Sequence, residues 1–270
     1  MTRFRLDLAY DGTDFHGWAA QPGLRTVEGE LTRAIEVALE RGALPPSHQL
    51  VVAGRTDAGV HARAQVAHLD IEAKVTCGVR LVVQLVHLLP HDIVIHKLVP
   101  APDGFDARFS AIGRTYCYRL WDSDSPIDPI ARRSVTVLPV HLDTDAMAAA
   151  AASLIGLRDF AAFCRPHDGG TSIRHLRRFD VFPVDGTIEC WLEADAFAHS
   201  MVRSLVGAVT QVGAGRRDIA WLAGMVAMTS RANDVPVLPP CGLTLEGVAY
   251  PPDDQLAARA EAARSLRSLP

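Results

Sequence analysis

The stretch V-V-A-G-R-T-D-A-G-V-H-A, residues 51–62, is the part of the chain from which its organisation can be worked out. It begins with apolar, β-branched residues typical of a strand, and then places Gly54 and Gly59 around Arg55 and Asp57. Because glycine permits positive φ and close backbone approach, this pattern predicts a tight, shaped loop after a strand. In an extended segment, residues i and i+2 point to the same face, so Arg55 and Asp57 are expected side by side.

The loop by itself leaves two interpretations of Asp57 open. A carboxylate held on a rigid loop beside guanidinium groups would suit an active site. The alternative is a polar β-turn in which Asp57 hydrogen-bonds to its own backbone, and the frequency of such turns favours this structural role when the loop is considered alone.

The composition is that of a folded globular protein. The chain has 270 residues, of which 49% are hydrophobic and 21% charged, and this length suits one large domain or two ordinary ones. The formal net charge is -4. Bulk charge therefore does not point to a nucleic-acid partner, and any such partner must be held by a local basic surface.

No segment predicts export or membrane insertion. Asp7 lies where a signal peptide needs its apolar run, and the alanine-rich stretch 146–157 is too short to span a bilayer, so we expect a cytoplasmic protein. The five cysteines form no C-x-x-C pair, and their odd number suggests neither a complete disulfide framework nor a structural zinc site. We expect buried thiols at Cys77, Cys117, Cys164, Cys190 and Cys241.

Hydrophobic periodicity predicts an alternation of strands and helices along the chain. Expected strands are 3–10, 65–71, 92–98, 115–121, 135–140, 179–183, 187–194 and 243–250. Expected helices are 26–40, 79–89, 144–156, 199–212 and 220–228, and residues 253–269 could form an exposed helix. This order predicts an α+β fold with a mostly antiparallel sheet, in which two halves, 1–108 and 109–270, repeat a crude architecture without repeating the sequence.

Seven motifs, in the same order along the chain, resemble those of the TruA-type tRNA pseudouridine synthases. The resemblance covers the chain from Leu6 to Tyr250. Its blocks are A-Y-D-G-T-D-F-H-G-W (9–18), G-R-T-D-A-G-V-H-A (54–62), L-P-H-D-I (89–93), F-D-A-R-F-S-A (105–111), R-T-Y-C-Y-R (114–119), A-F-A-H-S-M-V-R-S-L-V-G (196–207) and V-G-A-G (212–215). One block alone would be weak support for the resemblance. The ordered set is strong support, and it changes the favoured interpretation of Asp57 from a structural residue to an active-site residue.

The resemblance implies an isomerase that converts uridine to pseudouridine at nucleotides 38, 39 and 40 of the tRNA anticodon stem-loop, without cofactor or metal. Asp57 would be the catalytic carboxylate, acting on C1′ of the ribose or on C6 of the ring. Burial alone would favour its protonated form, and a paired arginine, implied to be Arg203, would oppose this. Without the resemblance, Arg203 would be assigned to a helix surface.

The remaining site residues are implied in the same way. Tyr116 would stack on the target uracil and assist proton removal at C5, whereas its structural alternative is a core tyrosine on a strand. Arg55 would help to extrude the base, since a stacked uridine must be flipped before its C1′ is reachable. Arg63, Arg114 and His61 are candidate RNA contacts, and the histidine could equally be a structural hydrogen-bonding group.

The resemblance further implies two pseudo-symmetric halves, each like a ferredoxin or RRM domain. Their sheets would join into one extended antiparallel sheet, with helices on one side and an RNA-binding cleft, and the protein would be a homodimer. Two other functions compete with this one. One is a non-catalytic RNA-binding protein on the same scaffold; the other is a metal-dependent hydrolase that uses Asp11, Asp14 and Asp57, although no histidine joins them at ligand spacing.

Overall fold

The computed structural model describes residues 1–41, 48–72, 77–165 and 171–264, with the side chains of 77–80 excepted. Its chain divides into two compact units: unit 1 contains Met1–Ile112 with Leu245–Ser265, and unit 2 contains Gly113–Thr244. The predicted division between residues 108 and 109 stays a prediction. In the compact units, the segment that starts at Leu245 belongs with the N-terminal part.

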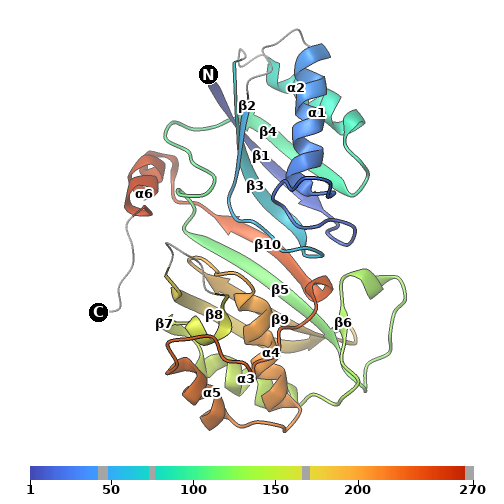
Figure 1. Cartoon of the computed structure of the whole chain (residues 1–270), viewed down its shortest axis with the longest axis vertical. Helices are drawn as coiled ribbons and strands as arrows, with labels where there is room; N and C mark the ends of the chain where they lie inside the picture. The colour runs from blue at the N-terminus through green and yellow to red at the C-terminus, as the bar shows by residue number, and fades with distance from the viewer. Residues whose placement is uncertain (42–47, 73–76, 166–170, 265–270) are drawn as a thin grey trace. The chain divides into compact units, whose positions relative to one another are not determined.

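Unit 1 is built on a sheet in the order β4-β1-β3-β10, with β2 also paired to β3 (Figure 1). Its strands are β1 Thr2–Tyr10, β2 His48–Val52, β3 His61–Ile71, β4 Ile93–Pro100 and β10 Leu243–Ala249, the last of which belongs to unit 1 from Leu245 onward. The pairs β1–β3, β1–β4 and β2–β3 are antiparallel, and Phe4 lies opposite Leu69. Every second residue of β1 is buried, as the alternating sequence predicts.

The helices of unit 1 form as their apolar spacing predicts. The helix α1, Val27–Arg41, buries the stripe Val27, Leu31, Ala34, Ile35, Ala38 and Leu39. The hydroxyl of Thr26 accepts a hydrogen bond from Gly29 N at 3.2 Å, and this bond satisfies an otherwise orphaned donor of the first turn. The second helix, α2 (Cys77–Leu88), contacts both α1 and β4.

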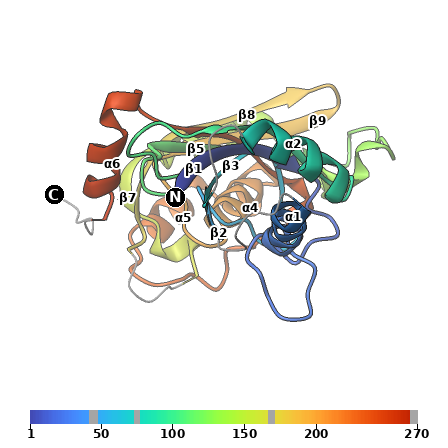
Figure 2. The same cartoon turned by 90° about the horizontal axis from the view of Figure 1, so that it is seen from above.

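The C-terminal helix forms and most of its residues are exposed, as predicted, but one face of it is buried. After the 3₁₀ turn η4 (Asp253–Gln255), α6 (Leu256–Ala262) buries Leu256 and Ala260. Leu256 packs in a cluster with Ala53, Val66, Phe105 and Ala107. Figure 2 shows α6 and α1 on opposite sides of unit 1, so unit 1 buries apolar side chains in two places.

Unit 2 carries the sheet β5-β9-β8-β7, in which each neighbouring pair is antiparallel, and β6 pairs with β5 in parallel. Its strands are β5 Gly113–Trp121, β6 Thr136–Val137, β7 Gly156–Asp159, β8 Ile173–Val184 and β9 Thr187–Ala194. Its helices are α3 Thr144–Ser153, α4 Met201–Gly213 and α5 Ile219–Val226, with 3₁₀ turns η1 Ala131–Arg133, η2 Ala161–Phe163 and η3 Pro240–Gly242.

Two ends of secondary-structure elements in unit 2 have the residue types that their geometry requires. Asp143 caps α3, because its carboxylate accepts from the backbone N of Asp145 and Ala146. The β8–β9 hairpin turns at Asp185 and Gly186, whose φ values of 45° and 78° are those of a type I′ turn.

Other boundaries differ from the predictions. The helix predicted for 144–156 ends at Ser153, and the strand β7, which the sequence did not predict, begins at Gly156 with φ 126°. A side chain rarely adopts that conformation, so the chain changes direction at the glycine. The extended run predicted for 135–140 is reduced to the two residues of β6.

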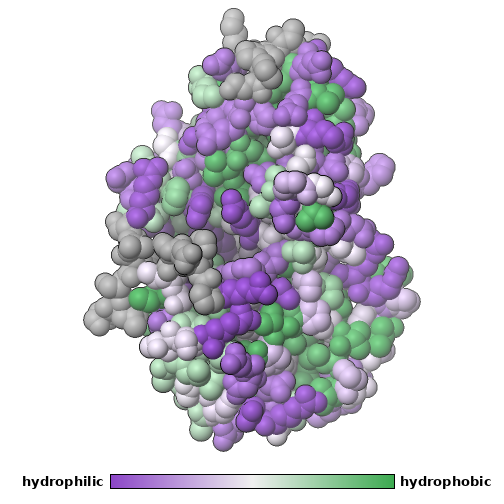
Figure 3. Space-filling view, in the orientation of Figure 1, coloured by the Kyte–Doolittle hydropathy of each residue, from purple (hydrophilic) through white to green (hydrophobic). Residues whose placement is uncertain are grey.

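The α+β class and the mostly antiparallel strand pairing are therefore confirmed. The visible surface of each unit mixes hydrophilic with hydrophobic residues (Figure 3). In the part of the chain that the structure describes, no helix has the length and apolar character needed to cross a membrane. Cys117, Cys164 and Cys190 are buried free thiols, as predicted, whereas Cys241 is partly exposed; the side chain of Cys77 lies outside the described residues.

Candidate active site

Asp57 occupies the first position of a tight turn between β2 and β3. Val60 N donates to Asp57 O at 3.2 Å. Gly59, the third residue of the turn, has φ 77°, and Ala58 before it has no positive φ. These features define a type II turn, which requires positive φ at the third position and so explains the glycine there. Asp57 is half-buried, and Thr56 just before it is 7% exposed.

The segment that follows β1 holds this loop through backbone hydrogen bonds. Gly59 N donates to Phe15 O at 3.2 Å, and Trp18 N donates to Thr56 O at 3.1 Å. Between these contacts, Gly17 has φ 91°, and a Cβ placed on it would lie 2.9 Å from Thr56 O. Because only a glycine fits this approach, residues 11–18 support the Asp57 loop from behind, and this stretch is called the backing segment below.

The aromatic residues of this backing segment belong to the core. Phe15 is 3% exposed and Trp18 1% exposed. The guanidinium of Arg25 lies 4.1 Å from the centre of the Phe15 ring and binds both carboxylate oxygens of Asp92, at 2.8 and 2.9 Å. Phe15 and Trp18 are therefore core residues and not an exposed platform for a ligand.

The candidate RNA contacts of unit 1 differ in exposure. Arg55 is exposed. His61 is buried, and its Nδ1 accepts from Gly12 N at 3.0 Å. Asp11 Oδ1 also lies 3.1 Å from Nδ1, so polar groups of the segment after β1 surround this ring nitrogen. These contacts correspond to the structural alternative for His61, and its contact with RNA stays a prediction.

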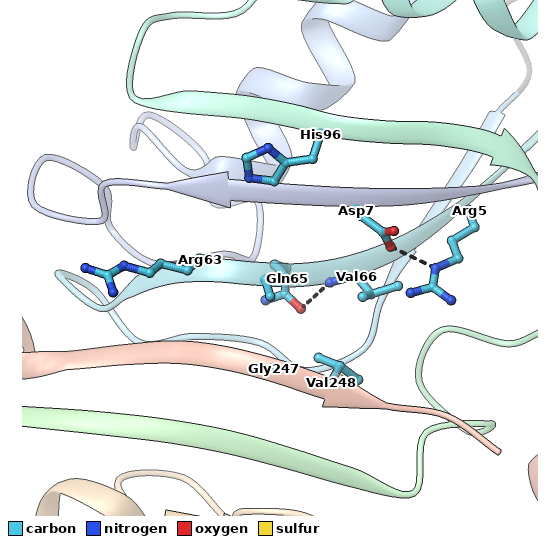
Figure 4. Close-up of a pocket in the computed structure, with 9 residues that line it drawn as sticks. Arg5, Asp7, Arg63, Gln65, Val66, His96, Gly247 and Val248 are labelled. Carbon is cyan, nitrogen blue, oxygen red and sulfur yellow. Dashed lines mark hydrogen bonds and ion pairs between the residues drawn. The ribbon is translucent and has the colours of Figure 1, made fainter. Parts of the chain in front are cut away.

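Arg63 lines a groove of about 230 Å³ in unit 1, shown in Figure 4. Its side chain is 65% exposed, with Nη1 3.6 Å from Glu246 Oε1, and an exposed pair of this kind contributes little stability. The other labelled residues lining the groove are Arg5, Asp7, Gln65, Val66, His96, Gly247 and Val248. Arg5 pairs with Asp7 at 2.8 Å, so the groove carries charges of both signs and has no marked preference for an anion.

In unit 2, Tyr116 lies near the start of β5 and is 8% exposed. Its ring packs edge-on against Phe197, with 5.2 Å between ring centres and an interplanar angle of 90°. Arg114, on the same strand, donates to Asp195 O at 2.8 Å. Both contacts join β5 to the segment between β9 and α4, and the contact with Phe197 limits the positions that the Tyr116 ring can take.

Arg203 lies in the first turn of α4, a helix that is buried along most of its length. Its Nε donates to Leu238 O at 2.7 Å, and Leu238 N approaches Arg203 O at 3.4 Å. Before the helix, Ser200 adopts the left-handed conformation with φ 63°, which is uncommon for a residue with a side chain. The apolar neighbours of Arg203 along the chain, Met201, Val202, Leu205 and Val206, are all buried.

The segment that holds Arg203 is itself held at both ends. Tyr118 Oη lies 2.7 Å from Pro239 O and 2.7 Å from Thr136 Oγ1. Burial raises the pKa of Tyr118, so its hydroxyl stays protonated and can donate. At the other end, a Cβ on Gly207 would lie 2.0 Å from Pro236 O, so this helical glycine allows the segment to lie against α4.

The predicted site residues thus fall into two groups, one in each unit. Arg55, Asp57, His61 and Arg63 follow β2 or lie on β3, whereas Arg114, Tyr116 and Arg203 lie on β5 and α4. The sequence did not single out the backing role of Gly17 or the Leu238 carbonyl on Arg203. The glycine in the motif 9–18 could have indicated the first of these features. The second could not be found, because every residue has a backbone carbonyl.

Among the described residues, one group has the geometry of metal ligands: Asp122, Asp124 and His141. Asp122 Oδ1 already accepts from Ser125 Oγ at 2.7 Å and from Asp124 N at 3.1 Å, so it is part of a local turn. The metal-dependent hydrolase alternative uses the carboxylates of Asp11, Asp14 and Asp57. Among the described residues, these three do not form a group with metal-ligand geometry.

Comparisons with known proteins agree with the motifs. A family model described as tRNA pseudouridine synthase matches residues 150–251. The tRNA pseudouridine synthase A of Cutibacterium acnes is 53% identical, over 99% of this chain and 96% of the relative. That of Frankia casuarinae is 50% identical (100% and 97%), and that of Streptomyces griseus subsp. griseus is 48% identical (99% and 95%).

This identity, spread over the full length of both chains, shows that the protein belongs to the tRNA pseudouridine synthases, a family of isomerases. All three relatives carry the name tRNA pseudouridine synthase A, so the similarity extends to that particular member of the family.

Proposed function

We propose that this chain isomerises uridine to pseudouridine at nucleotides 38, 39 and 40 of the tRNA anticodon stem-loop. The observation that carries the proposal is the loop of Asp57, which the backing segment holds through the hydrogen bonds from Gly59 N and Trp18 N. A carboxylate on a loop fixed in this way can be held close to one geometry, which is what positioning of a reacting group requires.

The reaction balances without an external reagent. The bond between N1 and C1′ breaks, the uracil turns, and a bond forms between C5 and C1′. The hydrogen on C5 leaves as a proton and N1 gains one. Asp57 acts as the nucleophile, at C1′ of the ribose or at C6 of the ring, and is released when the new bond has formed.

Arg203 serves as the charged partner of Asp57 in this proposal. Its place at the start of a buried helix and the bond from Nε to Leu238 O support this role, because they fix the plane of the guanidinium. Arginine suits a water-poor site since it keeps its charge and presents two further nitrogens to a carboxylate.

Tyr116 stacks on the flipped uracil and assists removal of the C5 proton, and Arg55 helps to extrude the base. The edge-on packing against Phe197 supports a defined ring position for Tyr116. The exposure of Arg55 supports access to the RNA. A guanidinium can stack in the space that a flipped base leaves.

RNA binding in this proposal takes place in a cleft between the two halves, whose sheets join into one extended sheet. Arg63, Arg114 and His61 contact the RNA there, and two copies of the chain form a homodimer that meets one cytoplasmic tRNA. Recognition of the RNA through its phosphates and its shape suits an enzyme that modifies several neighbouring nucleotides. Because phosphate contacts are electrostatic, binding should weaken as the salt concentration rises.

The test uses unmodified tRNA that carries tritium on uracil C5. We expect the protein to release tritium into water, and we expect this release to fall to background when nucleotides 38, 39 and 40 are replaced by cytidine. Absence of release from the unmodified tRNA would refute the activity, and tight binding without release would favour a non-catalytic RNA-binding protein. Release that a chelator abolishes would instead favour the metal-dependent alternative.

A further inference from the structure

Three polar side chains that the reaction does not use are buried directly beneath the Asp57 loop. They come from β1, from the loop itself and from β3, and their exposed fractions are 5% for Tyr10, 7% for Thr56 and 0% for Gln65. Burial of polar groups is costly unless they are hydrogen-bonded, so their bonds indicate why they are there.

The amide of Gln65 uses all of its polar atoms. Its Nε2 donates to Gly54 O at 2.9 Å and to Tyr10 Oη at 3.2 Å, and its Oε1 accepts from Val66 N at 3.2 Å. The bond to Val66 N is drawn in Figure 4. Because Oε1 meets an N–H, the orientation of the amide is settled, and Nε2 must be the donor to the tyrosine.

The direction of the next bond follows. Tyr10 Oη lies 2.8 Å from Thr56 Oγ1. Burial raises the pKa of Tyr10 to about 12, so the phenol stays protonated near neutral pH. Its oxygen accepts from Gln65, and Thr56 Oγ1 is the one acceptor found for its hydrogen among the described residues, so Tyr10 donates to Thr56.

We propose that the series Gln65, Tyr10 and Thr56 is a positioning relay that sets the place of Asp57 for the reaction. This inference rests on the proposed function. Gln65 holds the start of the loop at Gly54, and Tyr10 holds the side chain of Thr56, whose carbonyl is held by Trp18 N. The residue directly before Asp57 is therefore fixed on two sides, from β1 and from the backing segment.

The bond from Tyr10 also limits the hydrogen bonds that Thr56 can make. Because Thr56 Oγ1 accepts the hydrogen of Tyr10, its own hydroxyl hydrogen points away from Tyr10, and the bond from Tyr10 sets its orientation. Serine can make the same bond, whereas valine has the same shape and cannot. The three residues are positioning residues, because they act through the loop and not on the RNA.

The test compares Tyr10→Phe, Thr56→Val and Thr56→Ser with Tyr250→Phe. The last removes a hydroxyl that bonds to Ala107 O at 2.7 Å, also in unit 1, and serves as the matched control. We expect Tyr10→Phe and Thr56→Val to lower kcat for tritium release by roughly 10- to 100-fold, because small displacements of reacting groups are costly. KM should change by less than about threefold, since RNA contacts remain. Thr56→Ser and Tyr250→Phe should keep kcat within about threefold of the unaltered protein.

Amide hydrogen exchange of Trp18 and Gly59 gives a readout that does not depend on activity. We expect Tyr10→Phe to speed exchange at both amides, and Tyr250→Phe to leave them unchanged. Unchanged exchange in Tyr10→Phe would overturn the relay whether or not the protein is active. So would a kcat per folded molecule equal to that of the unaltered protein in both Tyr10→Phe and Thr56→Val. Failure of the unaltered protein to release tritium would refute the proposed function, and the exchange result would then decide the relay separately.

Discussion

Replacement of Gly17 by alanine tests the backing of the Asp57 loop most sharply. The added Cβ would lie 2.9 Å from Thr56 O, 3.2 Å from Ala58 N and 3.3 Å from Asp57 C, all backbone atoms that cannot turn aside. The φ of 91° adds strain of about 1–2 kcal/mol, the usual cost of a left-handed conformation for a residue with a side chain. Overpacking adds about 1–3 kcal/mol, so the total loss of stability is roughly 2–5 kcal/mol.

Gly23→Ala is the matched control for this change. Gly23 lies in the same loop with φ 74°, and an added Cβ would meet nothing within 4 Å. It should therefore show the left-handed strain without the contact, a loss of about 1–2 kcal/mol. Thermal unfolding should give the lower midpoint for Gly17→Ala, at roughly 2–4 °C per kcal/mol for a chain of this size. The tritium assay should show a kcat about 10²-fold lower, because the loop is displaced. Equal midpoints and equal kcat for the two variants would refute the backing role.

Three further changes test other parts of the structure. Ser200→Gly should raise stability in urea unfolding by up to about 1 kcal/mol, because it relieves the left-handed conformation at φ 63°; a loss would contradict the strain. Asp143→Ala should cost about 1 kcal/mol in the same assay, since it removes the cap of α3, and no loss would show that the cap is unimportant. The hydrogen bonds and charge of Arg3 lower the pKa of Asp70. The stability difference between the unaltered protein and Asp70→Asn should thus be complete above about pH 4, the unfolded pKa, and disappear as the pH falls through the lower folded value. A difference independent of pH would contradict that pairing.

The sequence predicted those features that depend on local pattern. The alternation of residues 3–10 predicted β1, and the spacing from 26 to 40 predicted α1. The turn at Asp185 and Gly186 consists of the residue types that such a turn requires. Each of these signals resides in neighbouring residues, so one sequence suffices to find it.

Contacts between distant segments could not be predicted in this way. Tyr10 has the sequence signal of an ordinary strand aromatic, and its bond to Thr56 depends on how β1 and the Asp57 loop meet. Leu238 reaches Arg203 through a backbone carbonyl, which every residue has. The buried face of the last helix could not be predicted, because the packing of Leu256 against Phe105 is set by the fold and not by the composition of the tail.

The central claim is that Asp57 performs the reaction. The most direct measurement is single-turnover tritium release from C5-labelled unmodified tRNA by the unaltered protein and by Asp57→Asn, with Asp14→Asn, an exposed aspartate of the backing segment, as the control. We expect release by the unaltered protein and by Asp14→Asn, and a rate at least about 10³-fold lower for Asp57→Asn, as loss of a nucleophile usually causes. Binding of the tRNA should change little. Release by Asp57→Asn at the rate of the unaltered protein would contradict the claim.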